Sequence, residues 1–333
     1  MRARALLLAV VIVCINEMAL AERNSQSIRH LAFDRGSAAL PWDSPCRSGP
    51  VSVLQYPRWN VQPFLGGAAT PGDATLTLKS TGPPLFNQTE QTINVDLSGV
   101  LVGLSLGCAL TDNLSCRIEA FDLVPSSEAS QIVTALQTGN SVAREFISHF
   151  HWDGVRGEGV VRLWGGLAFV GGLRYESLNI RLVSTASASS LSGTFNEGNA
   201  IFHAFNLYCG AEYTLSLPYA CSLVAKVAGF PCVYCHWDYN MPFQDPASPS
   251  SPIENSASGP ITKGAFGEIL IQGSHGLGFA EVGVFTKLSA ITLEKTIGIN
   301  AENASSLTTL QQPFDMRFTR RTIEAGGFVR IAF

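Results

Sequence analysis

The most distinctive reactive residues are Cys232, Cys235 and His236, which form a Cys-x-x-Cys-His string. In an exported protein this pattern attaches c-type haem, whose iron the histidine then ligates. Domains that carry such haem are helical, whereas this string directly follows Pro231 in a segment of β character. The alternative, which we favour, is a pair of cysteines that stabilises a loop. We therefore predict no cofactor and keep a haem-binding exported β protein as an alternative.

Two His-Trp-Asp tripeptides offer a second chemistry. Residues that alternate along a strand share one face, and imidazoles and carboxylates that converge from two strands can bind zinc or copper. The candidate ligands are His149, His151, Asp153, His236 and Asp238. The alternative, which we favour, places Trp152 and Trp237 in an aromatic belt at a membrane surface, flanked by polar residues. We therefore predict no metal site.

Motifs that indicate an enzyme are absent from the sequence. There is no G-x-S-x-G elbow, H-E-x-x-H pair, P-loop or G-x-G-x-x-G loop. Ser274 and His275 are adjacent, so on a strand their side chains point to opposite faces and cannot form a nucleophile–base pair. We therefore predict that the chain is not an enzyme.

The composition excludes two broad classes. Only 14% of the 333 residues are charged and 46% are hydrophobic, which does not fit a disordered chain. Lys plus Arg number 22, and the longest basic run is the pair Arg320-Arg321, so we expect no nucleic-acid partner. The 31 glycines and the low charge favour a membrane β-barrel or a large secreted β protein.

The first 21 residues have the three parts of a secretory signal peptide. Arg2 and Arg4 precede an apolar core over 5–15, and an Ala-x-Ala cleavage pattern ends at Ala21. We expect residues 1–21 to be removed, which takes away Cys14 and leaves seven of the eight cysteines. An odd number in an exported chain implies at least one free or intermolecular thiol.

The rest of the sequence alternates with a period of two. Over 99–110 the even-numbered residues are apolar and the odd-numbered ones are mostly Gly, Ser or Ala. A similar alternation, with the apolar residues at odd numbers, recurs over 159–170 and 199–215. Such stretches are longer than ordinary soluble strands and fit membrane-barrel strands. Thr111 to Asn113 predicts a tight turn. Polar segments predict long loops, with a short helix near 129–136 in the first: they are 125–145, 184–198, 241–263 and 296–313.

The C-terminal segment supports the same architecture. Val329, Ile331 and Phe333 share one face, and the sequence ends on the aromatic residue. This segment resembles the last strand of bacterial outer-membrane β-barrel proteins, in which such residues form the signal for the barrel-assembly machinery. The resemblance implies outer-membrane lipid and that machinery as partners, and it leaves a homo-oligomer open.

Further residues follow from the predicted barrel. Charges expected on the lumen face are Arg162, Arg174, Glu212, Arg320, Glu324 and Arg330. Cys108 and Cys116 lie symmetrically about Asp112, so a hairpin that turns there would place them opposite each other, as a possible disulfide.

We thus predict an all-β protein: an antiparallel transmembrane β-barrel of about 10–12 strands over 51–333, with short turns on one rim and long loops on the other. Residues 22–50 form an exported N-terminal segment. The predicted function is a porin-like channel for small solutes or a structural surface protein. A barrel enzyme that acts on outer-membrane lipid, or a haem- or metal-binding protein, is the alternative.

Overall fold

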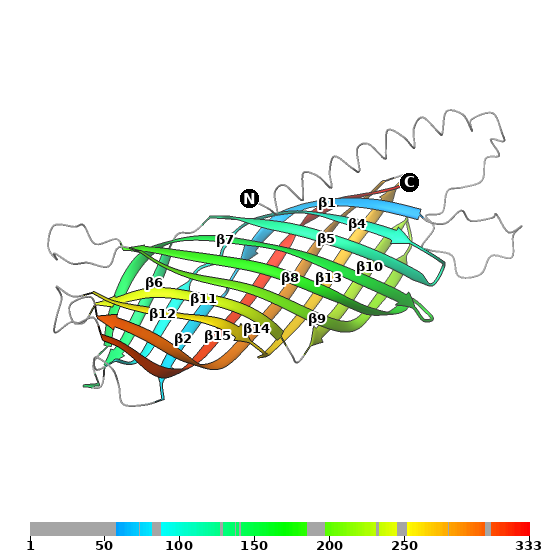
Figure 1. The fold of residues 1–333 in the computed structure, drawn as a ribbon. Coiled ribbons are helices and arrows are strands. Elements are labelled where there is room, and N and C mark those ends of the chain that lie inside the picture. Colours follow the sequence, from blue (N-terminus) through cyan, green and yellow to red (C-terminus); the bar gives the residue numbers. More distant parts are fainter. Residues whose placement is uncertain are drawn as a thin grey trace, which may run out of the picture.

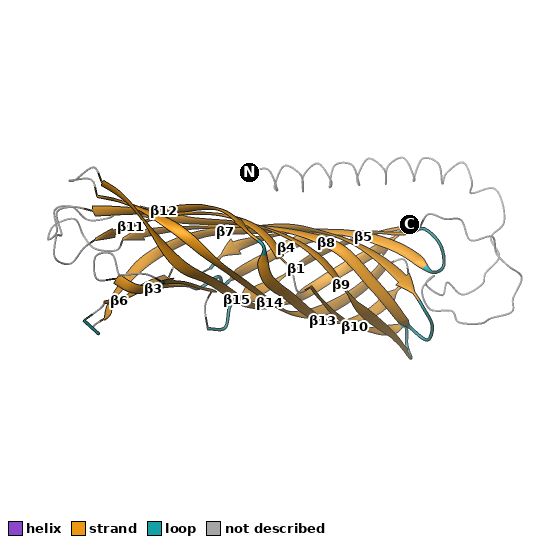
Figure 2. Cartoon of the chain, turned by 60° about the horizontal axis from the view of Figure 1, so that its bottom comes forward, coloured by secondary structure: helices purple, strands orange, loops and turns teal. Residues whose placement is uncertain are grey.

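The computed structural model describes residues 58–333 except 73, 82–87, 127–128, 137, 140, 185–196, 231–232, 245–251, 279 and 304–307. The predicted signal peptide and the segment 22–50 lie outside these residues. Everything described is strand, turn or short connection (Figure 2). The strands are β1 (Arg58–Ala69), β2 (Ala74–Ser80), β3 (Gln88–Val95), β4 (Gly99–Ala109), β5 (Leu114–Pro125), β6 (Ala129–Leu136), β7 (Ser141–Arg162), β8 (Leu167–Ser184), β9 (Glu197–Leu217), β10 (Cys221–Phe230), β11 (Val233–Gln244), β12 (Pro252–Ile261), β13 (Lys263–Leu277), β14 (Ala280–Asn303) and β15 (Thr308–Ala332). No described helix is long and apolar enough to cross a membrane.

The fifteen described strands close into one tall antiparallel barrel (Figure 1). Five of them, β7, β8, β9, β14 and β15, take part in the strand ring at both ends of the barrel. The others belong to the ring at one end only. Around one end the ring is β1, β4, β5, β7, β8, β9, β10, β13, β14 and β15. Around the other it is β2, β3, β6, β7, β8, β9, β11, β12, β14 and β15. Each ring has ten strands, which confirms the predicted antiparallel barrel of 10–12.

The rim that carries the C-terminus, here called the near rim, has only short turns. Leu110 donates its backbone N–H to the carbonyl of Leu114 at 2.9 Å, which closes the turn predicted at 111–113. Leu163 closes the next turn in the same way on Leu167, also at 2.9 Å. The segment 159–170, which the sequence suggested as one strand, therefore contains a hairpin.

The opposite, far rim carries the connections that we predicted to be long, and three of the four ranges were wrong. The range 125–145 holds β6 and the start of β7, so the short helix expected at 129–136 is a strand. Most of 241–263 belongs to β11 and β12, and most of 296–313 belongs to β14 and β15. Their Ser, Pro and Asn residues indicated loops, but ladder hydrogen bonds with neighbouring strands override that local preference. Within 184–198, residues 185–196 lie outside the described part.

The outer face of the barrel changes from apolar to polar along each long strand. On β8 the outward side chains nearest the near rim are apolar or aromatic: Phe169, Leu173 and Tyr175. Farther along the same face they are polar: Ser177, Asn179 and Arg181. The change occurs at one level on neighbouring strands. There a continuous row of directly paired, outward residues runs Asp122, Asp153, Ser177, His203 and His236, here called the boundary row.

The inner face changes in the opposite sense at the same level. On β8, Arg174 and Glu176 point into the lumen on the near side of the boundary row. On the far side the buried inward residues are Leu178, Ile180 and Leu182. The near half is thus apolar outside and charged inside, and the far half is polar outside and apolar inside.

The surroundings of each half explain this reversal. At about 3.3 Å per residue, the 25 residues of β15 extend roughly 80 Å along the strand. The apolar band of a membrane barrel is only about 25 Å tall, so lipid covers one half and water must surround the other. The near half therefore faces lipid, and the far half hides its apolar side chains as a soluble protein does.

The boundary row predicts that an outward-facing arginine lowers the free energy of unfolding more in the near half than in the far half. Leu207→Arg would place a cation among lipid chains near the middle of the near half, so it should lower the free energy of unfolding by about 2–4 kcal/mol. Asn179→Arg, also outward but beyond the boundary row, should change it by at most about 0.5 kcal/mol. Urea titrations in lipid vesicles, read from the mobility of unboiled samples, would measure both. Equal costs would contradict the boundary.

Candidate functional site in the barrel lumen

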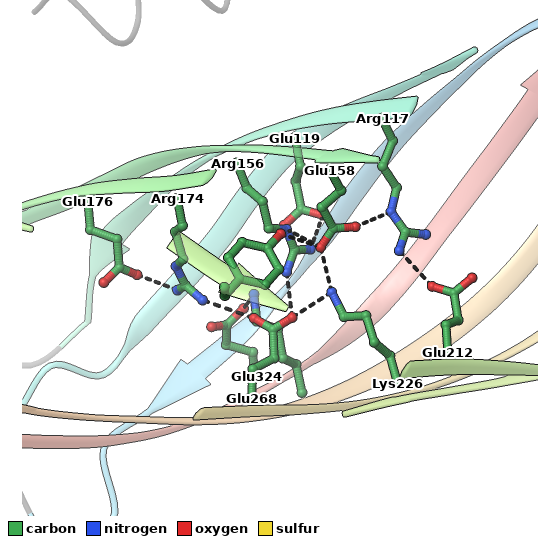
Figure 3. Close-up of polar contacts among 12 residues, drawn as sticks. Arg117, Glu119, Arg156, Glu158, Arg174, Glu176, Glu212, Lys226, Glu268 and Glu324 are labelled. Carbon is green, nitrogen blue, oxygen red and sulfur yellow. Dashed lines mark hydrogen bonds and ion pairs between the residues drawn. The ribbon is translucent and has the colours of Figure 1, made fainter. Parts of the chain in front are cut away.

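Fourteen charged side chains fill the lumen of the near half and form what we call the lumen network. They project inward from eight strands and reach across the barrel to one another. Figure 3 shows the central part of this network. Seven are acidic and seven are basic, so the set is neutral. The acids are Glu119, Glu158, Glu176, Glu212, Glu268, Glu281 and Glu324, and the bases are Arg117, Arg156, Arg174, Lys226, Lys287, Arg320 and Arg330.

Glu268 of β13 accepts contacts from cationic side chains on three other strands. Its Oε1 lies 2.6 Å from a guanidinium nitrogen of Arg156 and 2.6 Å from Nζ of Lys226. Its Oε2 accepts a hydrogen bond of 2.9 Å from Arg174. These cations come from β7, β10 and β8. Because β7 and β8 do not pair with β13, two of the contacts cross the lumen.

Glu158 of β7 has a similar role on the opposite wall. It accepts hydrogen bonds from Arg117, from Tyr208 and from Lys226, the last at 2.7 Å. Lys226 is fully buried and bridges Glu158 and Glu268. The attraction of two carboxylates offsets part of the cost of burying the lysine charge.

The remaining pairs extend the network toward both ends. Toward the far half, Arg320 donates to Glu176 at 2.7 Å and its guanidinium carbon lies 4.1 Å from the ring centre of Trp152. Lys287 pairs with Glu324. Toward the near rim, Arg330 donates to Glu281 at 2.8 Å.

A cavity of about 730 Å³ lies between the network and the near rim. The turns at 111–113 and 164–166 line its mouth, and Arg117, Arg156 and Glu212 line its inner end. The cavity is therefore a vestibule that opens at the near rim and ends at the network.

Beyond the network, aromatic side chains fill the far half. Trp152 and Trp237 are fully buried, and Phe202 stacks on Phe318 with ring centres 4.4 Å apart. Tyr239 donates to Gln91 at 2.8 Å, and burial raises the pKa of this phenol, so it stays a neutral donor. The aromatic belt that we predicted at Trp152 and Trp237 is wrong, because these side chains form the barrel core and their His and Asp neighbours face outward.

The predicted lumen charges all lie inside the barrel. Arg162 lines the vestibule, and the other five belong to the network: Arg174, Glu212, Arg320, Glu324 and Arg330. Sequence reasoning missed the central members Arg156, Glu158, Lys226 and Glu268. The alternation of residues along each strand could have identified them, because each occupies an inward-facing position of its strand.

The residues of the alternative haem string do not come together. Cys232 lies outside the described residues. Cys235 is fully buried in the lumen, whereas His236 points outward from the next position and is exposed. A thiol and an imidazole on opposite faces of a barrel wall cannot serve one haem.

The candidate metal ligands do not converge either. On β7 the Nε2 atom of His151 lies 3.3 Å from Asp153, with His149 farther along the strand, and on β11 the Nε2 atom of His236 lies 3.7 Å from Asp238. Strands β8 and β9 separate the two groups. Among the described residues, no three His, Cys, Asp or Glu side chains are placed to hold a metal ion.

Cys108 and Cys116 are direct partners in the β4–β5 register, as the sequence suggested. Both are free thiols in the structure, so the predicted disulfide is not formed there. At the C-terminus, Phe333 exchanges two backbone hydrogen bonds with Trp59, of 3.0 and 3.1 Å, while Ile331 pairs with Val61 and Val329 with Val282. The terminal segment thus closes the barrel against β1 and β14.

Removing one central acid should show how strongly the network depends on pairing. Glu268→Gln leaves three buried cations short of a counter-charge, so it should lower the free energy of unfolding by about 3–5 kcal/mol. Glu294→Gln is the matched control, since Glu294 pairs with Lys263 at 3.1 Å on the exposed outer face and should cost at most about 1 kcal/mol. Urea titration in vesicles would compare them. A Glu268→Gln barrel as stable as the control would refute the role of the network.

Comparison with known proteins shows which solved structures have a similar architecture. No family model matches the chain, and no curated protein matches it in sequence. Among solved structures it is similar to the outer membrane protease OmpT from Escherichia coli, with a TM-score of 0.64, 9% identity and coverage of 85% of this chain and 100% of that one. It also matches OprG from Pseudomonas aeruginosa, with a TM-score of 0.33, 9% identity and coverage of 83% and 96%.

The protease similarity corrects one prediction. We predicted that the chain is not an enzyme, and the similarity to OmpT contradicts that, because an outer-membrane barrel of this architecture can carry catalysis. At 9% identity the likeness establishes the fold alone. The chain therefore has the fold of bacterial outer-membrane β-barrel proteins, as its alternating strands and terminal aromatic residue had indicated.

Proposed function

We propose that this chain is a cell-surface barrel that holds its far half outside the outer membrane and whose lumen does not conduct solutes. The observation that carries the proposal is the lumen network. Its contacts at Glu268 and Glu158 cross the lumen between the vestibule and the far half. Of the two functions predicted from the sequence, the closed lumen favours the surface protein over the porin-like channel.

The tall far half supports the same proposal. A pore needs only the membrane-spanning height, whereas this barrel continues beyond the boundary row as a packed domain with a polar outer face. Ten strands also enclose too narrow a space for a wide channel, which is typical of barrels of about 16 strands. We further propose that residues 1–21 direct export and are removed.

Conductance gives the direct test of the closed lumen. Purified barrel inserted into planar lipid bilayers should show no stepwise conductance, while a general porin inserted under the same conditions shows it. Reproducible open steps from barrels that migrate as folded on unboiled gels would overturn the proposal.

Orientation can be tested by labelling intact cells. Ser141→Cys places a thiol at the far rim and Asp112→Cys places one in a near-rim turn; both positions are exposed. Barrels have short periplasmic turns, so a membrane-impermeant maleimide should label the Ser141→Cys variant above the wild-type background and should not label Asp112→Cys until cells are lysed. The reverse pattern would place the far half in the periplasm.

A further inference from the structure

The outer face of the near rim holds a thiol beside an imidazole. Cys221 begins β10 and is paired in register with His275 of β13. The Sγ atom of Cys221 lies 3.4 Å from Nδ1 of His275, within hydrogen-bond reach for sulfur. The thiol is partly exposed and the imidazole is exposed.

The preceding turn fixes the position of this thiol. Tyr219 and Ala220 both have left-handed backbone conformations, with φ of 63° and 55°, which side-chain-bearing residues rarely adopt. Gly276 donates its N–H to the carbonyl of Ala220 at 2.8 Å, which ties the turn to β13. This turn therefore places Cys221 at the strand position opposite His275.

No described cysteine can pair with Cys221 within the barrel. Its partner on β9 is Leu217, whereas Cys209 of the same strand pairs with Gly229, many residues farther up the hairpin. Cys209 and Cys221 lie on the two strands of one hairpin, but this register separates them. The odd number of cysteines expected in the exported chain also requires one without an internal partner.

We propose that Cys221 and His275 form a thiol–disulfide exchange site at the periplasmic rim, whose substrate is a disulfide. His275 takes the proton of the thiol, and the Cys221 sulfur attacks one sulfur of the incoming disulfide. The old S–S bond breaks as a new one forms, and the departing sulfur leaves as a thiol after it receives the proton from His275. One disulfide is consumed and one mixed disulfide is formed, so no further oxidant is needed.

The location suits this chemistry. In the orientation proposed above, on which this step rests, a site on the outer face of the near rim lies where lipid meets the periplasm, which is an oxidising compartment. A substrate can therefore reach Cys221 without entering the lumen.

The test follows the reaction of the folded, detergent-purified barrel with an aromatic disulfide reagent that releases a coloured thiolate. Wild-type protein should show one fast thiol. Cys221→Ser should lose that fast phase, and His275→Gln should slow it at least about tenfold because the base is gone. Cys209→Ser, which removes an exposed thiol that has only glycines opposite, should keep it.

Mass spectrometry of the briefly treated wild-type barrel identifies the modified cysteine without any variant. Modification first at Cys221 supports the proposal. Modification first at another cysteine, or an unchanged rate in folded His275→Gln, overturns it.

Discussion

A buried charge must find a counter-charge, and the rest of this barrel depends on that requirement. The near half faces lipid, and its central charges, such as Lys226 and Glu268, are buried in the packed lumen away from water. Transferring an ion from water into such surroundings costs several kcal/mol, which only close pairing and extra hydrogen bonds offset. The seven acids and seven bases achieve this collectively, because Glu158, Glu268 and Lys226 each bind partners from different strands.

The same pairing fixes the shape of the lumen. Contacts that cross from β7 and β8 to β13 hold opposite walls together and divide the interior into a polar vestibule and an apolar far core. Arg320 joins the two parts, since it pairs with Glu176 on one side and lies over the Trp152 ring on the other. The barrel therefore consists of two stacked halves in which the polarity of the inner and outer faces is reversed. Five continuous strands run through both halves.

Much of the fold could be predicted from the sequence, because a period of two is visible in any strand. The turn at 111–113 follows from its turn-forming residues, and the inward position of Arg174 and Glu212 follows from alternation together with their charge. Alternation does not say which face is inside, so Trp152 and Trp237 were assigned to a lipid belt although the far half buries them. Partners such as Arg156 and Glu268 are 112 residues apart and meet only across the closed lumen. Local composition misled at 129–136 and 296–313, where strand pairing decides the structure.

The most direct test of the reversal at the boundary row is a spin-label accessibility profile along the outer face of β8. Nitroxides at positions 169, 173, 177 and 181 would be compared for collisions with oxygen, which concentrates in lipid, and with a water-soluble nickel chelate. Oxygen should dominate at 169 and 173 and the chelate at 177 and 181. Oxygen-dominated collisions at all four positions would contradict a far half that stands in water.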